Sequence, residues 1–213
     1  MSHPHRFTRY YPTQDYLKAL DDTHLRYSLE LCEPGTGHVK VRQRLPLLPI
    51  VRHSSLDLSL MWLSKKESDA LRVTLAACSA GVVPLLLERR PVENGVRVRV
   101  DGHFLQGTGE TGFMLPRAIP GKVSFRSPAQ VFLDTREVLE MGSCGGPVIG
   151  SEGTCVGMVE GIVPQHSESE SAQGGEGLQA KAERLLGGCA VMIDAQHLSS
   201  LLQESLENGT LLQ

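Results

Sequence analysis

Apolar and polar residues alternate with a period of two along much of the chain, and this alternation restricts the fold more than any other feature. Successive side chains of a β-strand point to opposite faces, so a strand with one buried face shows this period. Residues 25–31 (LRYSLEL) and 96–100 (VRVRV) follow it, and the turn-forming segments CEPGTG and PVENG lie beside them. The pattern predicts an all-β chain of half-buried strands.

Five further segments have the apolar and β-branched character of short strands. They are LDLSLMWL, GKVSF, AQVFL, TCVGMVEGIV and CAVMID. Residues 164–188 are instead rich in Ser, Glu, Gly and Gln, which predicts a long loop. After Asp194, a residue suited to cap a helix, apolar residues at helical spacing predict a C-terminal amphipathic helix: Leu198, Leu201, Leu202 and Leu206.

Composition limits the classes of partner. The 213 residues suffice for one large domain or two small ones, and 40% hydrophobic residues are ordinary for a globular protein. The net charge is −3 and the basic residues are scattered, so we expect no nucleic acid as partner. The N-terminal residues lack an apolar signal region and no later run is long enough to span a membrane. We therefore expect no membrane partner and favour an intracellular protein; the oligomeric state stays open.

The cysteines and histidines exclude other classes of site. An odd number of cysteines without C-x-x-C spacing argues against a disulfide scaffold and against a structural zinc site. A reducing compartment follows as the simpler expectation. His166 and His197 have no partners at metal-ligand spacing, so we expect no metal. The five cysteines are Cys32, Cys78, Cys144, Cys155 and Cys189.

Cys144 lies among glycines in the segment MGSCGGPVIG, where neither a helix nor an ordinary strand is expected. A buried cysteine usually packs as a small hydrophobic residue. Here, however, Gly142, Gly145 and Gly146 permit positive φ and close backbone approach. The N–H groups of Gly142 and Cys144 are then able to point into one pocket and stabilise an oxyanion. This combination favours an exposed nucleophile.

The stretch GSCGGPVIGSEGTCVGMVEGIV resembles the C-terminal barrel of the chymotrypsin-fold (trypsin-like) peptidases. In that family the nucleophilic serine lies in G-D-S-G-G-P, or in G-N-S-G-G-P in HtrA-type members. This chain departs at Ser143, where Asp or Asn is usual, and at Cys144, where the serine would be. Because cysteine occurs at this point in chymotrypsin-fold proteases of RNA viruses, the resemblance implies an endopeptidase with thiol chemistry, a polypeptide substrate and no cofactor.

The resemblance also implies a fold, an all-β chymotrypsin-like double β-barrel with a C-terminal α-helix. IPGKVSF is similar to the strand before the nucleophile loop, and GGCAVMIDAQHLSSLL is similar to the HtrA-type ending of a strand that runs into a helix. We expect residues 1–75 to form the N-terminal barrel part and residues 76–213 the C-terminal barrel with the nucleophile loop and the terminal helix.

The remaining catalytic roles are also implied by the resemblance. HSSLDLSLMWL resembles the segment that holds the family's catalytic aspartate, which places that role on Asp57. A cysteine thiol needs a base to take its proton, and the family places a histidine before an early strand. MSH resembles the end of the family's T-A-A-H, so we choose His3 as base, with His5 and His24 as alternatives. If His3 is the base, the first strands of the N-terminal barrel are absent from the chain.

Two other functions compete with a peptidase. A pseudoprotease that serves as an interaction or scaffold module would keep the fold and lose turnover, and the replaced serine and the uncertain histidine favour it. The segment GTGETG at 107–112 fits a nucleotide-binding pattern, but the prolines in FMLPRAIPG forbid the helix that would receive a phosphate. The predicted walls of the specificity pocket, Val138 and residues 161–163, are apolar.

Overall fold

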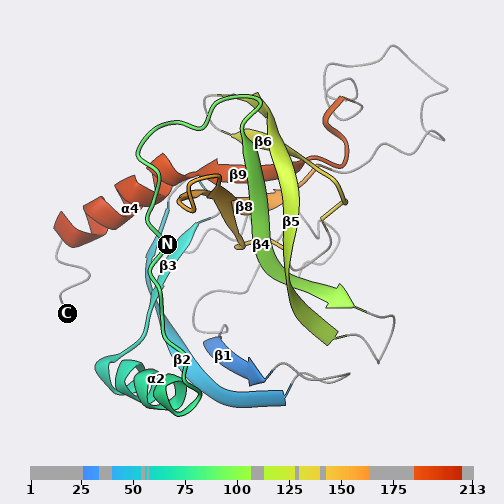
Figure 1. Cartoon of the computed structure of the whole chain (residues 1–213). Coiled ribbons are helices and arrows are strands. Elements are labelled where there is room, and N and C mark those ends of the chain that lie inside the picture. Colours follow the sequence, from blue (N-terminus) through green and yellow to red (C-terminus); the bar gives the residue numbers. More distant parts are fainter. Residues whose placement is uncertain are drawn as a thin grey trace, which may run out of the picture. The chain divides into compact units, whose positions relative to one another are not determined.

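A computed structural model of the chain describes residues 26–33, 40–53, 56, 58–106, 113–127, 130–139, 143–163 and 185–207 (Figure 1). The chain divides into two compact units, one consisting mainly of residues up to 83 and the other mainly of residues 84–204. The nucleotide-binding pattern at 107–112 and nearly all of the predicted loop at 164–188 lie outside the described residues. None of the described helices has the length and apolar character to cross a bilayer.

The second unit is a closed barrel in which every neighbouring pair of strands is antiparallel (Figure 1). The strands are joined in the order β4-β5-β6-β9-β8-β7. Their bounds are Arg97–Gln106 for β4, Phe113–Arg126 for β5, Val131–Thr135 for β6, Pro147–Gly150 for β7, Cys155–Ile162 for β8 and Ala190–Asp194 for β9. The strands expected in this unit are all present. β5 begins before GKVSF and includes Pro116 and Pro120, two residues that are incompatible with a helix interior.

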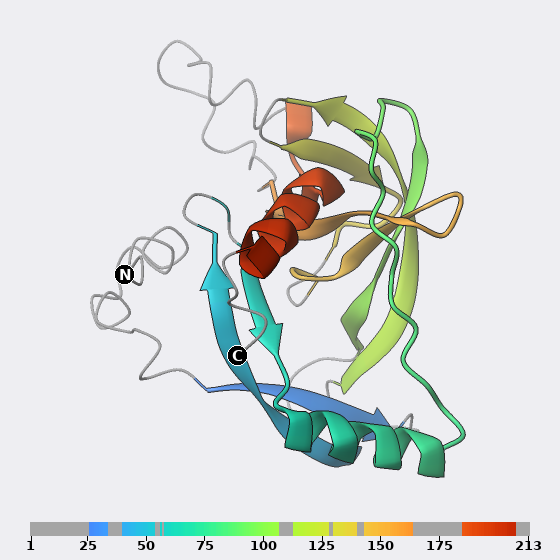
Figure 2. The ribbon, with the colours of Figure 1, turned by 90° about the vertical axis from the view of Figure 1, so that its left-hand side faces the viewer.

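The barrel interior is filled by the inward-facing side chains that the alternation predicts. On β4, Val98 and Val100 are buried while Arg97 and Arg99 are exposed. Large apolar side chains of the other strands complete the core. β4 and β5 form the longest hairpin of the barrel, and it is visible in Figure 1 and Figure 2. The core side chains with less than 2% exposure include Phe104, Val123, Leu133, Val148, Val159 and Met192.

A C-terminal helix, α4 (Ala195–Glu207), follows β9 directly. The predicted cap is confirmed, because the N–H of Gln196 donates to Oδ1 of Asp194 (2.9 Å). The predicted buried face needs a correction: Leu201 is 4% exposed, but Leu206 is 53% exposed and Ser205 is buried in its place. Residues 201 and 205 are one turn apart on the same side of a helix, whereas residue 206 is a further 100° round it. The all-β class with a barrel and a terminal helix is thus confirmed.

The first unit contains a three-stranded antiparallel sheet in the order β1-β2-β3. β1 spans Tyr27–Glu33, β2 spans Lys40–Arg52 and β3 spans Ser59–Trp62. The helix that follows, α2 (Lys65–Ala77), was not expected from the alternation, which ends at Leu63. Its signal is a capping pair, since the N–H of Glu67 donates to Oγ of Ser64 (3.3 Å) in the sequence S-x-x-E.

The segment that enters the barrel unit is fixed to β8 by hydrogen bonds. The N–H of Cys155 donates to the Leu86 carbonyl oxygen, and the N–H of Glu88 donates to the Cys155 carbonyl oxygen, both at 2.8 Å. The Glu88 carboxylate accepts from the N–H groups of Arg90 and Arg89 and from the Thr154 hydroxyl, which lowers the pKa of that carboxyl. These contacts hold the end of the β7–β8 hairpin.

Candidate active site

The glycine-rich segment predicted to hold the nucleophile forms a tight turn from Ser143 to Gly146, directly before β7. The N–H of Gly146 donates to the Ser143 carbonyl oxygen (3.0 Å), which closes a four-residue turn. Gly145 occupies its third position with a φ of 85°, where an L side chain is strained. Glycine is therefore required here by backbone conformation.

Hydrogen bonds to β8 hold this turn in the barrel, and the backbone of β4 packs closely against it. The N–H of Gly145 donates to the Val159 carbonyl oxygen (2.8 Å), and the N–H of Val159 donates to the Gly146 carbonyl oxygen (2.9 Å). On the other side, a Cβ at Gly146 would lie 2.7 Å from the carbonyl oxygen of Asp101 on β4. Gly146 is therefore required by close packing, a different reason from that for Gly145.

Ser143 and Cys144 have opposite environments within this turn. Ser143 is fully buried, whereas Cys144 is exposed. Cys144 is the second residue of the turn, and it faces solvent. The exposure of Cys144 is incompatible with the role of a buried hydrophobic residue, which is the usual role of an unreactive cysteine. Cys144 therefore lies at the surface of the barrel unit.

The other thiols of the barrel unit are protected. Cys155 is 4% exposed and its Sγ donates to the Gly157 carbonyl oxygen (3.2 Å). Burial raises the pKa of the Cys155 thiol and also raises the pKa of the partly buried Cys189 thiol. A raised pKa lowers the thiolate fraction near neutral pH, and the thiolate is the reactive form. Within the barrel, Cys144 is thus the exposed thiol.

Two further thiols are exposed in the first unit, Cys32 and Cys78. Cys78 lies directly after α2, and the guanidinium Nη1 of Arg42 donates to its Sγ. No disulfide joins any of the five cysteines, all of which belong to the described part of the chain. Cys32 and Cys78 are therefore the exposed thiols with which Cys144 is to be compared.

The residues predicted to wall a specificity pocket lie before the turn, at Val138, and at the end of β8, at residues 161–163. Val138 is 52% exposed, and Ile162 is partly buried against the barrel core. Glu160 directly precedes residues 161–163 and was not among the predicted pocket residues. Its Oε2 accepts a hydrogen bond from Nε2 of Gln130 (3.0 Å), and the pairing register of β8 shifts between Val159 and Gly161. A partly buried carboxylate therefore accompanies the apolar residues.

Among the predicted catalytic residues, Cys144 belongs to the described part of the chain. The others, His3, Asp57 and Gly142, lie outside it, as do the alternative bases His5 and His24. Within the described ranges, no group of three or more His, Cys, Asp or Glu side chains is arranged to hold a metal ion.

The loop that carries Asp57 is described at its two ends. The N–H of His53 donates to the Leu58 carbonyl oxygen (2.9 Å), which closes the loop between β2 and β3. The N–H of Leu56 donates to Nδ1 of His53 (3.0 Å), so the imidazole accepts a hydrogen bond from within the loop. His53 therefore has a clear role in holding the loop.

The two residues whose backbone meets the predicted nucleophile turn, Asp101 by close packing and Val159 by hydrogen bonds, had no sequence signal. Both act through their main-chain oxygens, so any residue type would supply the same atom. Their contribution depends on which backbone stretches meet in the barrel.

Comparisons with known proteins give similarities of fold. No protein-family model matches the chain, and no curated protein matches it significantly. A mutant of Rv3671c from M. tuberculosis H37Rv in an inactive form matches with a TM-score of 0.46 and 14% identity, over 78% of this chain and 68% of that chain. The MamO protease domain from Magnetospirillum magneticum matches with a TM-score of 0.45 and 14% identity, over 81% and 74%.

The HtrA-type protease AlgW with a decapeptide has a TM-score of 0.49 and 16% identity. The match covers 80% of this chain and 44% of that one, so this chain spans less than half the length of that protein. At these identities and TM-scores the similarities assign neither an activity nor site residues.

Proposed function

We propose that this protein is a trypsin-like endopeptidase that hydrolyses peptide bonds with Cys144 as its nucleophile. The observation that carries the proposal is the exposure of Cys144 on a turn that is hydrogen-bonded to β8 and packed closely against β4. An ordinary surface cysteine needs neither a glycine at positive φ after it nor a second glycine packed against a neighbouring strand. A nucleophile does need a fixed position, since rate depends on near-attack geometry.

In the proposed reaction the sulfur of Cys144 attacks the carbonyl carbon of the scissile peptide, and His3 takes the thiol proton. The C–S bond forms while the carbonyl oxygen becomes an oxyanion, which accepts hydrogen bonds from the N–H groups of Gly142 and Cys144. His3 then gives its proton to the leaving amine as the C–N bond breaks. Water, deprotonated by His3, hydrolyses the thioester and regenerates Cys144, and Asp57 orients the imidazole.

The test is alkylation of the intact protein with iodoacetamide near pH 7, followed by mass spectrometry of each cysteine. We expect Cys144 to react faster than Cys32 and Cys78, its exposed competitors, because the proposed base raises its thiolate fraction. Cys155 and Cys189 should react slowest. Their raised pKa values keep them protonated below the ordinary thiol pKa, and their alkylation should increase only as the pH rises above that value.

The matched variants are Cys144→Ala and Cys78→Ala. The first should abolish cleavage of a casein substrate, whereas the second should leave it unchanged. Replacing His3, His5 and His24 singly by Ala should identify the base, since only the base affects both cleavage and the alkylation rate of Cys144. If Cys144 reacts no faster than Cys32 and no cleavage is found, the proposal is wrong and the scaffold function is favoured.

A further inference from the structure

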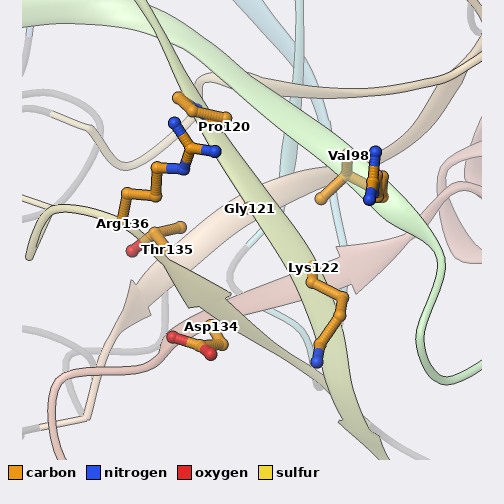
Figure 3. A pocket seen from close by; sticks show the side chains of 8 residues that line it. Val98, Pro120, Gly121, Lys122, Asp134, Thr135 and Arg136 are labelled. Carbon is orange, nitrogen blue, oxygen red and sulfur yellow. The ribbon is translucent and has the colours of Figure 1, made fainter.

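A hollow of about 670 Å³ lies on the outer side of β4, β5 and β6, and basic side chains surround it. The outward position follows from the alternation, because Lys122 and Asp134 are exposed while the neighbouring Val123 and Leu133 are fully buried. Gly121 contributes only backbone, and Figure 3 shows it between the side chains of Lys122, Asp134 and Arg136. The catalytic proposal uses none of these residues.

Strand register brings the charges together from distant parts of the sequence. Arg97 on β4 pairs directly with Lys122 on β5, and Lys122 pairs directly with Asp134 on β6. Arg136 follows β6, and its N–H donates to the Pro120 carbonyl oxygen (3.2 Å), which holds it beside β5. Like charges directly opposite on neighbouring strands destabilise a sheet. The Arg97–Lys122 pair is therefore unfavourable for folding, whereas the Lys122–Asp134 pair on the other side of β5 is favourable.

These basic groups differ from three arginines of the barrel strands that form ion pairs. In the described part of the barrel, Arg97, Lys122 and Arg136 form no ion pair. Asp134 lines the same hollow and also forms no ion pair in the described part of the barrel. Three positive charges and one negative charge give the hollow a net charge of +2. The arginines that do pair are Arg99 with Asp101, Arg117 with Glu137 and Arg126 with Asp194.

We propose that this hollow binds a phosphate group, either free or as a monoester on a polypeptide. A phosphate monoester carries a charge of about −1.5 to −2 at pH 7 and three acceptor oxygens, which match the net charge and the number of basic groups. Two of those groups are guanidinium forks, which bind phosphate oxygens in pairs. A single carboxylate would neutralise only half of the charge. Bound phosphate would also offset the repulsion between Arg97 and Lys122.

The experiment is isothermal titration calorimetry of the full chain at low salt. The probes are inorganic phosphate and two peptides that differ only in one phosphoserine. We expect phosphate-dependent binding that weakens as salt is added. Lys122→Ala and Arg97→Ala should each weaken it by about tenfold, as expected for loss of a charge-assisted hydrogen bond. Asp134→Asn should strengthen it, because the variant removes the one negative charge.

The matched control is Arg99→Ala, two residues along the same face of β4, where the guanidinium is already paired with Asp101. This variant should bind within about twofold of the wild type, since a paired charge contributes little to the anion. Tighter binding of the phosphopeptide than of inorganic phosphate identifies a polypeptide source, and equal binding identifies the free anion. The absence of binding to either probe, or an equal loss in Arg99→Ala, overturns the proposal. Peptide cleavage is not a readout, so this result is independent of the proposed peptidase activity.

Discussion

Two adjacent glycines support the exposed thiol for different physical reasons. Gly145 has a positive φ and open space where a Cβ would be. Gly146 does not have a positive φ, but a Cβ added to it would lie 2.7 Å from the carbonyl oxygen of Asp101 and 3.0 Å from that of Ser143. The first substitution strains one dihedral angle, whereas the second must move backbone.

We therefore predict unequal effects of alanine at these positions. Gly145→Ala should lower the free energy of unfolding by about 1 kcal/mol, the cost of a left-handed conformation with a Cβ. Gly146→Ala should lower it by about 2 kcal/mol or more, because overpacking against backbone relaxes poorly. It should also slow alkylation of Cys144, since the turn must shift. Urea unfolding and alkylation kinetics measure the two effects.

Gly153 offers the control for this pair. It has a φ of 81° and no heavy atom within 4 Å of a built Cβ, as at Gly145, but it lies in the turn between β7 and β8. Gly153→Ala should cost as much stability as Gly145→Ala and leave alkylation of Cys144 unchanged. Equal losses at Gly145 and Gly146 would contradict the steric explanation.

At the scale of elements, the junction of β9 and α4 depends on one buried carboxylate. Asp194 is 4% exposed, caps α4 through Gln196 and forms an ion pair with Arg126 on β5. The Arg126 side chain is 28% exposed, so water reaches the pair from one side. A single residue thus joins the helix start to the barrel wall.

Asp194→Asn should lower the free energy of unfolding by about 2 kcal/mol, because it leaves Arg126 without its partner but keeps a capping oxygen. Asp194→Ala should lower it by about 1 kcal/mol more, since it also removes the cap. The exposed pair Arg72–Asp69 on α2 is the reference, and Asp69→Asn should change stability by no more than about 0.5 kcal/mol. Chemical denaturation measures all three, and identical values for the two Asp194 variants would exclude a capping contribution.

At the scale of the whole molecule, the buried apolar side chains are unevenly divided. Within the described residues of the first unit, the core consists of Leu45 and Leu58, and α2 has no buried residue. The other buried apolar residues, from Val92 onward, belong to strands and loops of the barrel unit and to α4. Local stability follows the number of buried apolar contacts.

Native-state hydrogen exchange of the full chain should therefore separate the two units. We expect amides of α2 and β1–β3 to have protection factors at least about tenfold below those of β5, β8 and β9. The smaller core of the first unit opens at a lower free energy, so it exchanges without unfolding of the barrel. A uniform protection level across both units would contradict this prediction.

Local sequence patterns predicted most of the elements. The alternation at 96–100 identified β4, and Asp194 marked the start of α4, because strand period and capping depend on residues close in sequence. The motif around Cys144 predicted an exposed thiol for the same reason, since the conformational demand on Gly145 is local. Helix α2 was not predicted although Ser64 and Glu67 carry a capping signal, because none of its residues is buried and a helix without a buried face leaves no strong apolar period in the sequence.

The amino-acid sequence by itself determined the strand periodicity, the terminal helix and a turn that requires glycine. Only the tertiary structure decided that β4 closes on β7, that Gly146 lies against the Asp101 carbonyl and that Arg97, Lys122 and Asp134 form one row. The physical reason is that strand pairing joins residues far apart in the chain through backbone groups that every residue type shares, so side-chain identity alone does not specify which partners meet.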